Sequence, residues 1–119
     1  MPDTSTGSLG EDYVTAVLIE KGYRLVARNF HSRYGEIDII VRDDRYIVFV
    51  EVKTRKVKSL TSPFEAVTKS KQQKIIKTAE FFLMRNKFNL QPRFDVAAVE
   101  TREKEVISLN YLTDAFRVN

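Results

Sequence analysis

The 119-residue chain contains no cysteine and no tryptophan, a single histidine, His31, and only four glycines and three prolines. Without cysteine there can be no disulfide, no thiol nucleophile and no zinc site with thiolate ligands. A single histidine excludes a zinc site built from several imidazoles. Any metal would therefore be held mainly by carboxylates, carbonyls and water, and these hard oxygen ligands favour Mg²⁺ or Mn²⁺.

The chain also lacks long apolar runs and a basic-then-apolar start. None of its hydrophobic stretches approaches the ~20 residues that span a membrane, and the first residues do not match a secretion signal. We therefore expect no membrane association and a cytoplasmic protein. The length fits one domain with a real core, over residues 8–119, preceded by a flexible tail over residues 1–7.

Charge is unevenly distributed along the chain. The formal net charge is +4, but residues 51–77 alone carry +6 and the remainder carries −2. The basic residues of this block are Lys53, Arg55, Lys56, Lys58, Lys69, Lys71, Lys74 and Lys77. A concentrated basic surface attracts anionic polymers, which makes a nucleic acid the expected partner.

Two runs rich in Ile, Val and Phe, at residues 37–41 and 47–52, surround the polar segment Arg42-Asp43-Asp44-Arg45. Branched and aromatic residues fit a pleated sheet, and Asp tolerates turn conformations, so this stretch predicts a β-hairpin. A symmetric turn about Asp43 and Asp44 would pair Asp38 with Phe49. It would make Asp38 and Glu51 diagonal neighbours, roughly 7–8 Å apart at the backbone.

Strand alternation places several charges on one face of this hairpin. That face carries Glu36, Asp38 and Ile40 from the first strand and Phe49, Glu51 and Lys53 from the second. Two interpretations stay open. The face is the hydrated side of an antiparallel sheet, or it lines a cleft where the carboxylates share a cation. The apolar Ile40 and Phe49 on the same face favour the cleft, because buried carboxylates need a partner.

The remaining segments predict two helices and three further strands. Ser8 to Glu11 matches a capping box and Gly22 a helix stop, which gives a helix over residues 9–21. We expect strands over residues 23–30, 94–100 and 105–110, a helical turn after Pro63, a helix over residues 69–85 and a terminal cap over residues 111–119. The fold class is α/β, bordering on α+β, with a mixed central sheet of about five strands flanked by helices. The strand before the longer helix could pair in parallel with the one after it.

Asp38, followed thirteen residues later by Glu51-Val52-Lys53, with Glu11 upstream, resembles the PD-(D/E)xK nuclease superfamily and its restriction-endonuclease-like fold. More narrowly, the chain resembles the small bacterial YraN-like family, predicted endonucleases related to archaeal Holliday-junction resolvases. The motifs are Gly10-Glu11, Gly22-Tyr23, Arg28-Asn29, Gly35-Glu36-Ile37-Asp38, Phe49 to Arg55 and Arg93 to Val96. Ile37 replaces the proline of the superfamily's name, which leaves the acidic ligand unchanged.

This resemblance implies a metal-dependent endonuclease that hydrolyses DNA phosphodiester bonds, with branched or unusual DNA structures as candidate substrates. Asp38 and Glu51, with the carbonyl of Val52, would ligate Mg²⁺ or Mn²⁺. Lys53 would orient the attacking water or offset phosphate charge. Glu11 would complete the site, unless it only closes the capping box with Ser8.

Nucleic acid would contact the basic block through Arg55, Lys56, Lys69, Lys71 and Lys74. The rival interpretation of the helical lysines is a solvated surface. Cutting both strands of a duplex would favour a two-fold homodimer. Two other functions stay open: a non-catalytic nucleic-acid-binding module that keeps a vestigial nuclease site, and a protein–protein adaptor.

Overall fold

The computed structural model describes residues 6–57 and 67–118. Its elements follow in the order α1 (Thr6–Glu20), β1 (Arg24–Ser32), β2 (Gly35–Arg42), β3 (Tyr46–Lys56), α2 (Lys69–Arg85), β4 (Gln91–Arg102) and β5 (Glu105–Phe116). The strands form one sheet in the order β1-β2-β3-β4-β5, with β3 and β4 parallel and the other pairs antiparallel. The expected mixed α/β sheet with flanking helices is confirmed.

The helices pack on opposite faces of the sheet, because neighbouring residues of the central strands point to opposite sides. Residues of α2, among them Ile76 and Phe82, pack with Phe49 in one core, which we call the α2-side core. Val14 and Leu18 of α1 pack with Val48 and others in the α1-side core. Where β2, β3 and β4 are covered on both faces, at residues 39–41, 47–50 and 96–99, their sequences are continuous apolar runs.

Helix boundaries follow the local chemistry, with one correction. Gly22 has a φ of 102° and ends α1 in a Schellman arrangement, where the N–H groups of Gly22 and Tyr23 donate to the carbonyls of Ile19 and Leu18. The predicted capping box is wrong, because α1 begins at Thr6 and Ser8 lies inside it. Glu11 is therefore a residue of the helix body whose side chain is not needed for a cap.

The longer helix occupies residues 69–85 as predicted, with Thr68 as its N-cap accepting a hydrogen bond from the Lys71 N–H. The last strand is longer than expected and runs to Phe116, so residues 111–116 extend the sheet instead of capping it. The helical turn expected after Pro63 and most of the tail expected over residues 1–7 lie outside the described residues.

The predicted hairpin exists, but its register was wrong by two residues. Backbone pairs run from Arg42↔Ile47 to Ile39↔Val50, so the turn is centred between Asp44 and Arg45. The reason is the side chain of Asp43, which accepts hydrogen bonds from the N–H groups of Arg45 and Tyr46 and so starts the turn.

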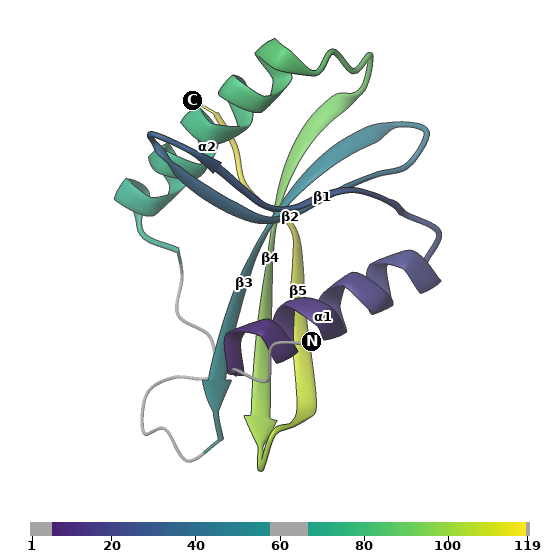
Figure 1. Cartoon of the computed structure of the whole chain (residues 1–119), viewed down its shortest axis with the longest axis vertical. Coiled ribbons are helices and arrows are strands. Elements are labelled where there is room, and N and C mark those ends of the chain that lie inside the picture. Colours follow the sequence, from purple (N-terminus) through teal and green to yellow (C-terminus); the bar gives the residue numbers. More distant parts are fainter. Residues whose placement is uncertain (1–5, 58–66, 119) are drawn as a thin grey trace.

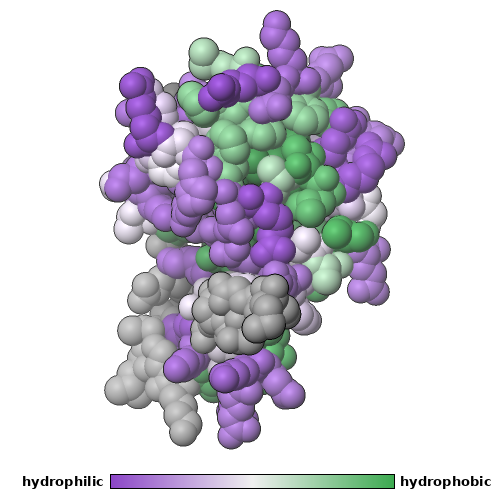
Figure 2. Space-filling model, in the orientation of Figure 1, coloured by the Kyte–Doolittle hydropathy of each residue, from purple (hydrophilic) through white to green (hydrophobic). Residues whose placement is uncertain are grey.

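Beyond this paired region β2 and β3 separate. In Figure 1 the end of the β1–β2 hairpin turns toward α2, while the lower half of β3 continues beside β4 and β5. We call the gap between the diverging strands the fork. In Figure 2 hydrophobic residues gather in the upper half of the visible face and hydrophilic ones predominate below. Among the described residues, no helix is long and apolar enough to cross a membrane.

Candidate metal and nucleic-acid site

Asp38 lies at the fork, next to the last backbone pair between β2 and β3. Its side chain is buried, and its Oδ2 accepts a hydrogen bond from the Val52 N–H at 2.7 Å. A carboxylate thus replaces the backbone carbonyl that a continuing ladder would have offered to Val52. The Asp38 carboxylate is thereby fixed against β3, within reach of the side chain that precedes Val52.

The backbone around Asp38 departs from regular alternation. Ile37 and Ile40 both join the α2-side core, although they lie three positions apart, whereas Ile39 joins the α1-side core. On β1, Asn29 lies between the partners of Ile37 and Ile39 and has a φ of 51°, a left-handed conformation that Asn tolerates better than most residues. The distortion of both strands at this point accompanies the opening of the fork.

Glu51 faces Asp38 from β3. The last backbone pair is Ile39 with Val50, so Asp38 and Glu51 are the first residues of the two strands beyond the paired region, and the predicted diagonal register is wrong. The Glu51 side chain is only 13% exposed. Burial, the charge of Asp38 and a hydrogen bond with Asp38 together raise the pKa of Glu51 to about 8, against a lowering by Lys71. The two carboxylates are crowded enough to share a proton or a cation.

Lys53 and Lys71 lie in the same hollow as Glu51. A hollow of about 410 Å³ is lined by Glu51, Val52, Lys53, Thr54, Val67, Thr68 and Lys71. The Nζ of Lys71 lies 3.7 Å from Glu51 Oε2. Glu51, which contacts Asp38, therefore shares this hollow with Lys53 and with a lysine from the first turn of α2.

Glu11 approaches the same region from the α1 side. Burial raises the pKa of Glu11, with the Asp38 charge as the next cause, so the two acids sense each other. Its Oε1 lies 3.6 Å from the Nη2 of Arg28, which also pairs with Asp12 at 2.9 Å. The sequence did not predict that Arg28 pairs with Glu11, although Arg28-Asn29 is one of the motifs that resemble the YraN-like family.

Gly10 explains why α1 can bring Glu11 close. A Cβ at Gly10 would overlap the Thr54 hydroxyl and would lie 3.2 Å from the Cβ of Thr54 and 3.3 Å from its Cγ2. Only a residue without a side chain lets the helix approach β3 this closely.

The chemistry of the donors fits Mg²⁺ or Mn²⁺. Asp38 and Glu51 offer hard oxygen ligands, and a dication would relieve the repulsion between them. In the described ranges, no three His, Cys, Asp or Glu side chains lie close enough together to hold a metal by themselves. Glu11 is thus not grouped with the pair, and a bound ion would have to keep several waters, as Mg²⁺ usually does.

The other predicted phosphate-binding residues do not share one environment. Lys56, Lys69 and Lys74 are exposed, the first at the end of β3 and the others on α2. Arg55 is half-buried, with its Nε 4.0 Å from Glu100 of β4. Glu36 lies at the rim, where its carboxylate is 3.3 Å from His31 Nδ1.

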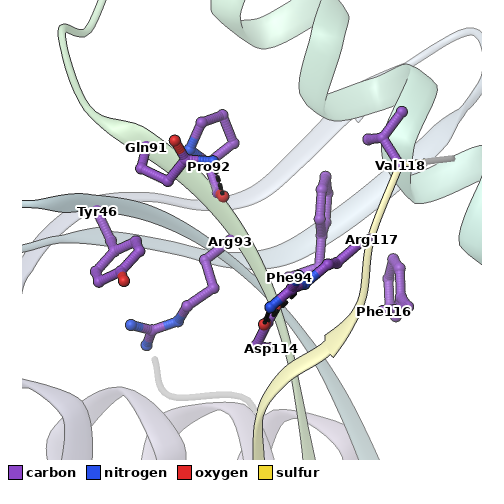
Figure 3. Close-up of a pocket in the computed structure, with 9 residues that line it drawn as sticks. All are labelled: Tyr46, Gln91, Pro92, Arg93, Phe94, Asp114, Phe116, Arg117 and Val118. Carbon is purple, nitrogen blue, oxygen red and sulfur yellow. Dashed lines mark hydrogen bonds and ion pairs between the residues drawn. The ribbon is translucent and has the colours of Figure 1, made fainter.

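A second hollow of about 420 Å³ lies between the start of β4 and the end of β5 (Figure 3). Its charged groups are already paired. Arg117 binds Asp114, and Arg93 binds the buried Asp95 at 2.9 Å. In Figure 3 the Arg93 side chain points toward Tyr46, whose ring it covers at 4.7 Å. With its charges satisfied, this hollow is a weaker candidate than the fork.

Comparison with known proteins gives one consistent result. Residues 10–99 match the model of a family described as "Uncharacterised protein family UPF0102". A UPF0102 protein of Prosthecochloris aestuarii is 44% identical over 116 residues, covering 92% of this chain and 91% of the relative. One from Clostridium perfringens is 41% identical over 116 residues, covering 96% and 95%. One from Pelobacter propionicus is 42% identical over 121 residues, covering 98% and 86%.

Proposed function

Because the chain belongs to the UPF0102 family, as its resemblance to YraN-like proteins predicted, we propose that it is a metal-dependent endonuclease acting on DNA. The observation that carries this proposal is the meeting of Asp38 and Glu51 at the fork, with Lys53 lining the same hollow. The exposed lysines of α2 supply a positive surface beside the acids. A DNA substrate implies a cytoplasmic location.

The residues have distinct roles in this proposal. Asp38, fixed by the Val52 N–H, and Glu51 would hold Mg²⁺ or Mn²⁺, with the Val52 carbonyl as a further donor. When bound, the ion lowers the pKa of a coordinated water and stabilises charge on the scissile phosphate. Lys53 would orient the attacking water or balance phosphate charge. Glu11 would hold a bridging water, because Arg28 already pairs with its carboxylate.

The proposal is tested by incubating the purified protein with linear, single-stranded, flapped and four-way DNA in the presence of Mg²⁺ or Mn²⁺. We expect at least one substrate to be cut. Asp38→Asn should reduce the rate by at least 100-fold, roughly the share of metal and electrostatic stabilisation in such reactions. Asp44→Asn is the matched control, because the Asp44 side chain is 97% exposed and pairs only with Arg24 in the described structure. A protein that cuts no member of this panel would contradict the catalytic proposal.

One observation favours a second function, a nucleic-acid-binding module without catalysis. In residues 6–57 and 67–118 only two acids converge at the fork, and Glu11 is paired with Arg28. This alternative predicts DNA binding that does not change with Asp38→Asn or with added metal. Calorimetric titration with Mn²⁺ separates the two functions, because only the nuclease requires a metal site.

A homodimer is a further part of the nuclease proposal, since a two-fold pair could cut both strands of a duplex. Sedimentation of the protein with and without duplex DNA measures this assembly directly.

A further inference from the structure

Lys71 occupies an unusual place for a cation. It lies in the first turn of α2, where its N–H donates to the side chain of the N-cap Thr68 at 3.1 Å. The N-terminus of a helix carries partial positive charge, so a lysine there is disfavoured unless an anion compensates it. No acidic residue lies in this first turn. The compensating anion comes from another element.

That anion is Glu51. The Lys71 Nζ lies 3.7 Å from Glu51 Oε2, and both residues line the hollow at the fork. The Glu51 side chain is 13% exposed whereas that of Lys71 is 47% exposed. The carboxylate is thus held in place and the ammonium stands at the solvent side of it, on a long and flexible stem.

A divalent ion on Asp38 and Glu51 would need the same carboxylate. An ammonium and a dication this close repel each other strongly in a partly buried site. Lys71 can leave, because its flexible side chain is 47% exposed, whereas the buried acids cannot follow it.

We propose that Lys71 is the resident cation of this site, paired with Glu51 in the metal-free protein and displaced from it by a divalent ion. This inference rests on the proposed metal site and adds a role for a residue of α2. After displacement, the Lys71 ammonium remains at the solvent side of the hollow. Binding of a divalent ion therefore changes Lys71 from the partner of Glu51 into an unpaired cation beside the site.

The test is a calorimetric titration of three proteins with MnCl₂: wild type, Lys71→Met and Lys74→Met. Methionine keeps most of the stem and removes the charge. Lys74 is the matched control, because it is an exposed lysine on the same helix, one turn further along. We expect Lys71→Met to bind Mn²⁺ about fivefold more tightly than wild type, since a competing cation is gone, and Lys74→Met to change the dissociation constant by less than about twofold.

The outcomes separate the two proposals. Equal affinity in Lys71→Met and Lys74→Met, or weaker binding in Lys71→Met, overturns the displacement of Lys71 and leaves the metal site standing. Absence of Mn²⁺ binding in all three proteins overturns the metal site and the proposed nuclease with it.

Discussion

At the scale of single residues, Glu51 is a weaker acid in the folded protein than in the unfolded chain. Its burial and the neighbouring Asp38 both act against a second negative charge, and Lys71 offsets only part of that effect. The metal-free protein therefore holds this proton more tightly when folded than when unfolded. The stability of the fold is tied to the protonation of one side chain.

We predict that the metal-free protein becomes less stable as pH rises. The pKa of Glu51 is raised from 4.5 to about 8, so its stabilising contribution is complete below pH 4.5 and is lost as pH approaches 8. Urea unfolding in EDTA should show a fall of about 2–4 kcal/mol in the free energy of unfolding across this window. Glu51→Gln, which keeps the shape but cannot ionise, should flatten the curve; an unchanged slope in that variant would contradict the assignment.

Asp95 is the other acid on which the structure depends. It is 1% exposed and accepts hydrogen bonds from Arg93, from the Tyr111 hydroxyl at 2.6 Å and from the Asp114 N–H at 2.9 Å. Truncating one partner of a buried ion pair leaves the other charge unpaired.

Asp95→Ala should therefore lower the free energy of unfolding by about 3–5 kcal/mol. The exposed pair of Arg24 and Asp44 is the control, and Asp44→Asn should leave stability near that of wild type. Thermal melts of both variants under one buffer provide the comparison. If the two variants melt together, the Arg93–Asp95 pair does not have the structural role given to it here.

At the scale of elements, the approach of α1 to β3 decides where Glu11 lies. Gly10→Ala should destabilise the protein by about 1–3 kcal/mol, because the hydroxyl of Thr54 would have to move and its Cβ would stay 3.2 Å away after any rotation of the side chain. Thr54→Ala removes the hydroxyl and the Cγ2 and keeps only the Cβ, so Gly10→Ala should cost clearly less in that background. Chemical denaturation of the four proteins of this double-mutant cycle measures the coupling.

The elements themselves were largely predictable from the sequence, since apolar periodicity and Gly22 mark helix and strand limits locally. The hairpin register was not, because Asp43 begins the turn through its side chain and so moves the turn centre by one residue. That shift changes the pairing by two positions, which preserves the face of the paired residues 39–42 and 47–50. Asp38 and Glu51 still meet despite the wrong register, and Lys53 lines the same hollow as Glu51.

Other parts of the site could not be read from the sequence because they depend on packing between distant segments. The pairs Arg28 with Glu11 and Lys71 with Glu51 join residues 17 and 20 positions apart on different elements. No local pattern encodes such pairs. The Arg93–Asp95 pair had a visible signal, since residues two apart on a strand share a face.

At the scale of the whole molecule, α2 carries exposed lysines and reaches Glu51 at the fork through Lys71, so long-range attraction should govern encounter with DNA. We predict that the logarithm of the binding constant falls linearly with the logarithm of salt concentration. Lys69→Ala and Lys74→Ala should each reduce the slope by about 1, whereas Lys87→Ala, beyond the far end of α2, should not. Fluorescence anisotropy in EDTA over a range of NaCl concentrations tests this. Equal slopes in all three variants would mean that phosphates do not contact α2.

The hydrogen bond from the Val52 N–H to Asp38 makes the Val52 amide sensitive to ion binding at the fork. An amide that donates to a side chain exchanges its hydrogen with solvent when that hydrogen bond opens. An ion bound to Asp38 would compete with the Val52 N–H for the same carboxylate. The rate of deuterium uptake at the Val52 amide should therefore differ between the protein with an ion bound at the fork and the protein without one, even when no nucleic acid is present. The same arrangement means that a ligand at the fork also alters how firmly β2 and β3 are joined.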